Sequence, residues 1–384
     1  MRLILLGMIC FIRCAHAGVD IEMPAGQYPV GTTQLVVAKQ FENIGNHALE
    51  QYLKGARSMV KGAMYLDEIL AEPEYTPIVN VQVPANKIFG PHAGETLPLV
   101  LFVAYPTTTD NPRAEYVFPY TAVERHKLPH MQRREDKPLL ADAHKKYPLI
   151  ILSHGRSGHT AYDFANAIKL ASHGYIVAGL FYGDDRLKSG EKFDRYRHYL
   201  RPFMTSQAID YLLAHKDLKQ FIDEKKIGAS GHSFGGFTIL ALAGGDVFGE
   251  GNSVRDPKIK AGLVSAPWLG GRYFLQKVYA FGDENKSLEK VQIPLLGLFG
   301  TKDKVAHKSY ILPALAQTKG PRYVVELVDQ PHVYEPESWQ DQEHWGLLFF
   351  DAYLKDNKDS MELLSKAEKA KGGNKDRQLF EYQN

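Results

Sequence analysis

Cysteine is almost absent from this chain of 384 residues, which contains two, Cys10 and Cys14, both close to the N-terminus. If the N-terminal segment is removed, the remaining chain has no thiol. This excludes disulfide bridges as a source of stability, and it excludes a cysteine nucleophile. The fold must therefore depend on its hydrophobic core.

Long hydrophobic runs are also lacking. The apolar stretch Leu3–Ile12 is too short to span a bilayer, follows the positive Arg2 and precedes Ala15-His-Ala17, which fits the small-x-small cleavage rule. We therefore expect residues 1–17 to be a signal peptide, with a mature start near Gly18 and export to the periplasm or the outside of the cell.

Two alternatives to a cleaved signal stay open. The segment could remain as a membrane anchor, since Arg13 is unusual so late in a signal. Cys14 could be a lipoprotein site, although Ile12 and Arg13 before it are not the small residues that such a site needs. With a cleaved signal, we expect no stable membrane span.

An excess of charge of one sign is missing too. The chain has 46 basic and 44 acidic residues, a formal net charge of +2, and no basic stripe of the kind that binds nucleic acid. Its 44% of hydrophobic and 23% of charged residues are typical of a globular protein. We expect one domain over 78–356, preceded by an irregular extension over 18–77 with a helix at 46–70, and followed by a frayed polar tail over 357–384.

What is present is an alternation of apolar strands with amphipathic helices. It predicts an α/β fold, with a doubly wound and mostly parallel sheet and helices on both faces. Strands are expected at 78–83, 99–105, 147–153, 174–180, 259–265, 293–299 and 323–328, and helices at 164–173, 205–216, 237–243 and 339–353. Two polar segments, 107–146 and 183–202, are predicted as loops over the active-site side.

The stretch Lys226–Gly236 organises the chain. An apolar strand runs into Gly-His-Ser-Phe-Gly, and a helix-forming run follows at once. This is the pattern of a nucleophile elbow, whose strained turn needs small neighbours. It predicts Ser233 as the nucleophile, with the backbone N–H of Phe234 directed at a developing oxyanion. The alternative is an ordinary strand–helix turn without catalytic function.

A base and an acid are expected to follow the nucleophile in the chain. Asp303 follows one predicted strand and His332 follows the last, so both should reach the same sheet edge as Ser233. Asp329 and His344 are the alternative acid and base. Asp303 could also serve only as the N-cap of the segment after it.

A second donor for the oxyanion is predicted in the loop at 153–158. Gly155 and Gly158 allow its backbone to approach closely, and we assign the donor to the backbone N–H of Arg156. His154 is expected to brace this loop. His232, next to the nucleophile, is expected to have a packing role.

Aromatic and apolar residues near the predicted rim could form an acyl pocket. They are Phe234, Trp268, Leu269 and Tyr334, which could equally be ordinary core and rim residues. Arg195, Arg197 and Arg201 could contact an anionic group of a substrate, but we expect them to form a solvated face.

The segments Tyr147–Gly155, Gly231–Gly236 and Gly300–Asp303, together with Pro331-His332, resemble the α/β-hydrolase superfamily. Within it they are similar to the secreted platelet-activating factor acetylhydrolase and dienelactone hydrolase-like group, over roughly residues 78–355. The resemblance implies a serine carboxylesterase with its triad at Ser233, Asp303 and His332.

Two features depart from that group. Dienelactone hydrolases use cysteine where this chain has Ser233, and the acetylhydrolase branch takes its acid from a place that here reads Ser265-Ala-Pro-Trp268, without a carboxylate.

We therefore expect an exported serine hydrolase that cleaves carboxylic esters, as an esterase, a lipase or an acetylhydrolase-like enzyme, through an acyl-enzyme on Ser233. Its partner would be a small ester or lipid, and the chemistry requires no metal and no cofactor. A peptidase or amidase of the same fold and a non-catalytic binding protein remain as alternatives.

Overall fold

The computed structural model describes residues 19–21, 24–33, 77–117, 127–132, 136–156, 158, 163–183, 195–273, 276–335, 338–370 and 376–379. The predicted signal peptide at 1–17 and the predicted helix at 46–70 lie outside the described residues.

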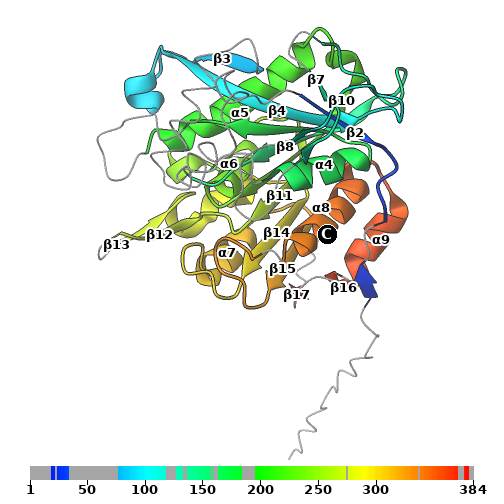
Figure 1. The fold of residues 1–384 in the computed structure, drawn as a ribbon. Helices are drawn as coiled ribbons and strands as arrows, with labels where there is room; N and C mark the ends of the chain where they lie inside the picture. The colour runs from blue at the N-terminus through cyan, green and yellow to red at the C-terminus, as the bar shows by residue number, and fades with distance from the viewer. Residues whose placement is uncertain are drawn as a thin grey trace, which may run out of the picture.

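A single large sheet forms the centre of the molecule (Figure 1). It has 11 strands in the order β17-β15-β14-β11-β10-β8-β9-β4-β2-β7, and β3 also pairs with β4. Its strands are β2 (Val30–Thr33), β3 (Ile78–Gln82), β4 (Thr96–Pro106), β7 (Met131–Gln132), β8 (Tyr147–Ser153), β9 (Ile176–Phe181), β10 (Ile222–His232), β11 (Ile259–Ser265), β14 (Leu295–Gly300), β15 (Arg322–Leu327) and β17 (Asp376–Leu379).

The remaining elements surround this sheet. The helices are α4 (Phe164–Ser172), α5 (Arg197–Ala214), α6 (Phe234–Leu242), α7 (Lys308–Leu315), α8 (Trp339–Leu354) and α9 (Lys358–Lys366), with short 3₁₀ turns η2 (Lys87–His92), η5 (Lys219–Phe221), η6 (Val247–Gly249) and η7 (Asp283–Lys290). Three two-stranded pairs join β1 (Val19–Ile21) to β16 (Ala367–Ala370), β5 (Tyr116–Val117) to β6 (Lys127–Leu128), and β12 (Gly270–Tyr273) to β13 (Gln276–Tyr279).

The predicted α/β class with a mostly parallel sheet is confirmed. The six strands β9, β8, β10, β11, β14 and β15 run parallel to one another, while β4 and β17 are antiparallel to their neighbours at either side of this block. Every residue of β8 is buried, as expected for a parallel strand covered on both faces, whereas burial alternates along β3.

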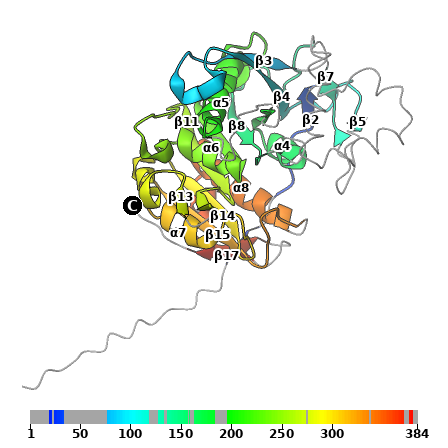
Figure 2. The same ribbon diagram turned by 90° about the vertical axis from the view of Figure 1, so that its left-hand side faces the viewer.

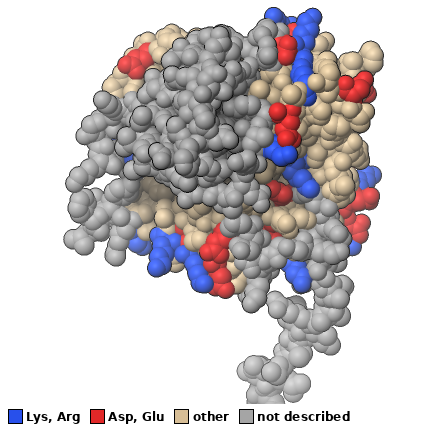
Figure 3. Space-filling view, in the orientation of Figure 1, with Lys and Arg blue, Asp and Glu red and all other residues tan. Residues whose placement is uncertain are grey.

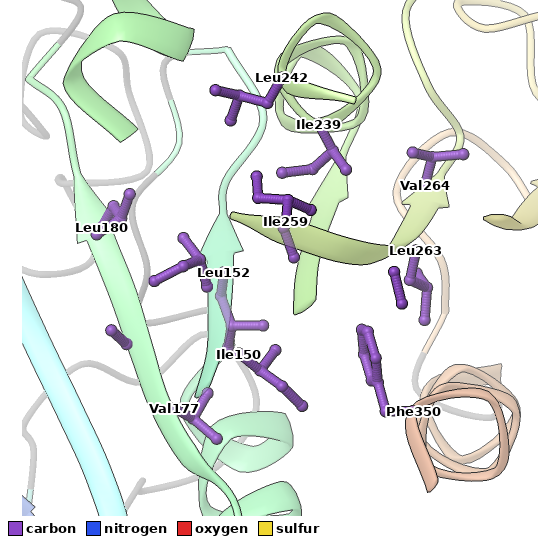
Figure 4. Packing of buried hydrophobic residues seen from close by; sticks show 14 of the residues in the cluster. Ile150, Leu152, Val177, Leu180, Ile239, Leu242, Ile259, Leu263, Val264 and Phe350 are labelled. Carbon is purple, nitrogen blue, oxygen red and sulfur yellow. The ribbon is translucent and has the colours of Figure 1, made fainter. Parts of the chain in front are cut away.

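Helices cover both faces of the sheet. Figures 1 and 2 show α5, α6 and α7 on one face and α4 and α8 on the other. In Figure 4, Ile239 of α6 and Phe350 of α8 lie on opposite sides of β11, whose Leu263 is directed toward Phe350. Both helices thus pack their apolar side chains against the central strands, which buries β11 and its neighbours on both faces.

The strand order positions the functional edge. β9 and β10 lie on opposite sides of β8, so the chain direction across the sheet reverses at β8. Ligands of such sheets bind outside the carboxyl ends of the strands near this reversal. Ser153 ends β8 and His232 ends β10, so the residues that follow each of them meet at this edge.

Three expectations about loops and ends are wrong. The extension at 18–45 is not wholly irregular, because β2 lies within the main sheet, hydrogen-bonded to β4. The tail after 357 is not simply frayed, because α9 packs on α8 and β17 pairs with β15. The segment 183–202 is not entirely loop, because α5 already begins at Arg197. Local polarity suggested loops, and tertiary pairing decided otherwise.

The described surface carries no dominant charge on the face drawn in Figure 3, where Lys and Arg lie interspersed with Asp and Glu. Within the described ranges, no helix is both long and apolar enough to cross a bilayer.

Candidate active site

Ser233 occupies a sharp turn between β10 and α6, at φ 54° and ψ −115°, a backbone conformation that non-glycine residues rarely adopt. The turn closes only because its neighbours lack side chains. A Cβ on Gly231 would lie 2.4 Å from the Gly235 carbonyl, and a Cβ on Gly235 would lie 1.9 Å from the Ser153 oxygen. The strained turn predicted from the glycine pattern is therefore present.

The loop after β11 holds this turn in place. The Ser233 N–H donates to the Ser265 carbonyl over 2.8 Å, and the Trp268 N–H donates to the Ser233 carbonyl over 2.9 Å. Both backbone groups of Ser233 are thus satisfied by a neighbouring loop, and its side chain is 8% exposed. Fixed backbone and limited solvent access favour a single direction for the hydroxyl.

The structure brings the three predicted polar side chains together. His332 Nε2 lies 2.9 Å from Ser233 Oγ, and His332 Nδ1 lies 2.8 Å from Asp303 Oδ2. Asp303 follows β14 and His332 follows β15, so all three come from the carboxyl ends of parallel strands. The arrangement is a hydroxyl, an imidazole and a carboxylate in hydrogen-bonded series, the geometry that activates a serine for attack.

Asp303 is buried and held at both oxygens. Its Oδ1 accepts from the backbone N–H groups of Val305 and Ala306 at 2.7 and 2.8 Å, while Oδ2 faces His332. Burial alone raises the pKa of Asp303, but the hydrogen bond and charge attraction of His332, with the two backbone N–H groups, outweigh it and leave the pKa below its usual value. The turn-capping role and the contact with the imidazole are therefore both present.

The alternative acid and base lie elsewhere. Asp329 forms an exposed ion pair with Lys302 at 3.2 Å. His344 is on the exposed side of α8, with Nδ1 2.6 Å from the Gln340 carbonyl. Neither takes the place of Asp303 or His332 in the hydrogen-bonded series.

His232 supports the imidazole from behind. Its Nε2 lies 2.7 Å from the His332 carbonyl oxygen and donates to it, and the two rings are 4.9 Å apart. Burial lowers the pKa of His232 to about 4, and repulsion from His332 adds to this effect. His232 is therefore neutral at pH 7 and donates to the backbone of His332.

The predicted oxyanion loop lies against Ser233. A Cβ on Gly155 would be 3.4 Å from the Cβ of Ser233 and 3.3 Å from His232 Nδ1, so this backbone is in close contact with the elbow. The Gly158 N–H donates to the Gly155 carbonyl over 3.1 Å and closes the loop into a turn around Arg156. The brace expected of His154 is present, because its Nδ1 lies 2.7 Å from the Gly155 carbonyl.

Arg201 is the residue that the sequence interpretation placed wrongly. It was expected on a solvated face, but its side chain is 1% exposed and donates to the carbonyls of His154 and Gly155. Arg195 does lie at the surface, paired with Glu250. His198, Arg201 and Thr205 are spaced so that they share one face of α5, and all three are buried. This spacing is a sequence signal for the burial of Arg201, but it applies only if the helix begins before Thr205.

The predicted pocket residues separate into two kinds. Leu269 and Tyr334 belong to the hydrophobic core, at 1% and 5% exposure, and the Tyr334 hydroxyl accepts from Ser265 Oγ at 3.1 Å. Trp268 is partly buried and packs with Phe234 around the His198 ring, at centroid distances of 5.0 and 4.8 Å. Aromatic side chains thus lie next to Ser233 on the α5 side.

Comparison with known proteins gives an independent view of the same chain. The family model described as platelet-activating factor acetylhydrolase, isoform II, matches residues 123–189, which include the loop after β8 and end before the nucleophile. The platelet-activating factor acetylhydrolase of Cavia porcellus is 26% identical over 168 residues. Those of Canis lupus familiaris and Bos taurus are 30% and 32% identical over 169 residues.

Each of these alignments covers 33% of this chain and 36% of the relative, so the chain spans about a third of the length of the curated relatives it matches. Over that part of its length the chain is homologous to an esterase family, and the resemblance to the platelet-activating factor acetylhydrolases is confirmed.

Proposed function

We propose that this protein is a serine hydrolase that cleaves carboxylic esters through an acyl-enzyme on Ser233. The observation that carries the proposal is the continuous series from Ser233 Oγ through His332 to Asp303, with hydrogen-bond distances of 2.9 and 2.8 Å. The similarity to acetylhydrolases supports the ester, and not another acyl compound, as the substrate class.

In the first half-reaction, His332 Nε2 takes the hydroxyl proton as Ser233 Oγ attacks the carbonyl carbon of the ester. The carbonyl π electrons move to oxygen and form an oxyanion, which faces the N–H groups of Phe234 and Arg156. The C–O bond to the alcohol then breaks, and the imidazolium returns the proton to the leaving oxygen. Asp303 holds the Nδ1–H tautomer and stabilises the imidazolium.

In the second half-reaction, His332 takes a proton from water, whose oxygen attacks the acyl carbon. The bond to Ser233 Oγ breaks, the serine recovers its proton and the carboxylic acid leaves. No electron is gained or lost, and every proton is carried by His332, so the sequence needs no metal and no cofactor. We expect incubation with EDTA to leave the rate unchanged.

The test is hydrolysis of a series of p-nitrophenyl esters from acetate to longer chains, by the wild type and by Ser233→Ala. We expect wild-type turnover and a loss of about 10⁶-fold in kcat without the hydroxyl. A fluorophosphonate should label the wild type once per chain and leave Ser233→Ala unlabelled. Equal labelling of both, or no labelling of either, would contradict the proposal and favour a binding protein.

Amides of the same acyl groups decide between an esterase and an amidase. The triad serves both, so the comparison is made on kcat/KM for the ester and the anilide of one acid. We expect the ester to be preferred, given the similarity to acetylhydrolases. Preference for the anilide would overturn the substrate class while leaving the nucleophile in place.

We also propose that the protein is exported, on the ground of the apolar segment and cleavage pattern at residues 1–17. The N-terminal residue of the protein recovered from the cell envelope or medium tests this. Recovery of the uncleaved chain in the cytoplasm would contradict export without affecting the chemistry.

A further inference from the structure

The buried Arg201 contacts both backbone segments that are predicted to bind the oxyanion. These are the loop after β8 and the turn that contains Phe234. Its guanidinium carbon lies 4.2 Å from the ring centroid of Tyr182 and 5.1 Å from that of Phe234. Phe234 follows the nucleophile directly, and Tyr182 follows β9. The planar cation therefore lies within cation–π distance of two rings, and a flat guanidinium suits such contacts better than an ammonium does.

The guanidinium donors are directed at the loop after β8. Nη1 donates to the His154 carbonyl over 2.6 Å, and Nη2 donates to the Gly155 carbonyl over 3.0 Å. The two terminal nitrogens of one planar guanidinium thus bind the carbonyls of two adjacent residues. The Gly155 oxygen also accepts from Gly158 N–H and lies 2.7 Å from His154 Nδ1, so three donors converge on this one carbonyl.

Holding a carbonyl fixes the N–H on the other side of the same peptide unit. In a planar trans peptide, the C=O of one residue and the N–H of the next point in opposite directions. The hydrogen bond from Arg201 to the Gly155 oxygen therefore directs the Arg156 N–H away from Arg201. In the same way, the hydrogen bond to the His154 oxygen directs the Gly155 N–H away from Arg201. The backbone of Gly155 lies against Ser233. The side of the loop that carries these N–H groups, opposite the carbonyls bound by Arg201, is therefore the side close to Ser233.

We propose that Arg201 is a positioning residue for the oxyanion donors: by binding the carbonyls of His154 and Gly155 it orients the backbone N–H of Arg156 toward the oxyanion. The proposal rests on the proposed function, since the oxyanion belongs to the ester reaction. Arg201 acts through the loop, with its charge and its fork geometry, and not by contact with the substrate.

The test compares Arg201→Met, which keeps bulk without donors, and Arg201→Lys, which keeps the charge without the fork. We expect Arg201→Met to lower kcat by about 100- to 1,000-fold, the effect of losing an oxyanion donor, with KM changed by less than about threefold. Arg201→Lys should recover part of this loss, because one ammonium can reach one of the two carbonyls. Rates are normalised to the fraction of chains that a fluorophosphonate finally labels.

Arg322 provides a matched control. It is also 1% exposed and also donates to two carbonyls, those of Leu315 and Thr318 at 2.8 and 3.0 Å, but at the start of β15. Arg322→Met removes a buried guanidinium whose Nη1 donates to both carbonyls, at the start of β15 and not at the loop after β8. We expect it to lower the unfolding midpoint while kcat per labelled chain stays within about threefold of the wild type. Equal losses of kcat in the two methionine variants would overturn the proposal.

Amide hydrogen exchange adds a readout that does not depend on activity. Peptides containing Gly155 and Arg156 should exchange at least about tenfold faster in Arg201→Met and at the wild-type rate in Arg322→Met. Unchanged exchange at these residues together with unchanged kcat would refute the positioning role. A wild type that hydrolyses no ester would instead refute the proposed function, and the exchange experiment would still decide whether Arg201 holds the loop.

Discussion

At the scale of single residues, the site depends on how Asp303 and His232 hold His332 in place. Asp303 gives one oxygen to two backbone N–H groups and the other to His332. His232 gives its Nε2 to the carbonyl of that same His332. The imidazole is thus fixed through both its ring and its backbone, which leaves Nε2 of His332 as the atom that can accept the Ser233 proton.

Asp303→Asn should abolish most activity while preserving the fold. The carbonyl oxygen of the amide would take the place that accepts from Val305 and Ala306, which turns its NH₂ group toward His332 Nδ1. The imidazole must then carry its proton on Nε2 and cannot act as a base. We expect kcat to fall by about 10⁴-fold, as for such a change in other serine hydrolases, with an unchanged circular dichroism spectrum. Retention of more than a tenth of the activity would show that the carboxylate is not the orienting group.

His232 makes stability depend on pH in a defined window. Its folded-state pKa of about 4 lies below the ordinary value of 6.5, so the unfolded chain binds the proton more readily. The contribution is complete above about pH 6.5 and is lost progressively as the pH falls toward 4, amounting to about 3 kcal/mol at about 1.4 kcal/mol per pKa unit. Urea unfolding between pH 4.5 and 7 should show this slope, and His232→Gln should flatten it. Parallel slopes in the two proteins would contradict the assignment.

At the scale of elements, the elbow depends on how closely β10, α6 and the end of β8 approach one another. Gly235, in the first turn of α6, lies directly over the carbonyl of Ser153. The same close approach that makes the turn possible brings the loop at Gly155 against Ser233. The close packing of β10, α6 and the end of β8 is therefore also what brings the residues of the candidate site together.

Gly235→Ala should separate these elements. The new Cβ would lie 1.9 Å from a backbone oxygen, which cannot move aside as a flexible side chain would. We expect a loss of about 2 kcal/mol or more in the free energy of unfolding, and a large fall in kcat as the loop shifts. Gly271→Ala in β12, where a Cβ would meet nothing within 4 Å, is the control and should change stability by less than about 0.5 kcal/mol. Similar losses in both variants would contradict the close approach.

At the scale of the whole molecule, the sheet collects segments from both ends of the chain. β2 adds to one side through β4, and β17 closes the other side by pairing with β15. β15 is the strand that leads to His332, so β17 covers the edge of the element that positions this imidazole. An uncovered β15 would expose a row of unsatisfied backbone groups.

A chain ending at residue 370 should be less stable than the full chain. It loses the pairing of Val324 with Leu379 and of Leu327 with Asp376. We expect a loss of about 2 kcal/mol, which lowers the thermal midpoint by roughly 2–3 °C and promotes aggregation. A chain ending at residue 380 retains β17 and is the control. If both truncated chains unfold at the temperature of the full chain, the pairing makes no measurable contribution.

The sequence by itself determined the strand–helix alternation, the nucleophile elbow and the residue types that meet at the strand ends. These features are local, because a burial period, a glycine-lined turn and a residue directly after a strand can each be recognised within a few positions. The confirmed α/β class and the hydrogen-bonded meeting of Ser233, Asp303 and His332 follow from them, since parallel strands bring their carboxyl ends to one edge.

Only the tertiary structure decided which polar segments lie at the surface and which are buried or join the sheet. Arg201 is charged and sits in a charged stretch, so composition pointed to solvent, but its guanidinium is satisfied by carbonyls that are distant in sequence and by two aromatic rings. β17 is polar and becomes part of the sheet because β15 supplies its hydrogen-bond partners. In both cases the energy comes from contacts between segments far apart in the chain, which no local pattern records.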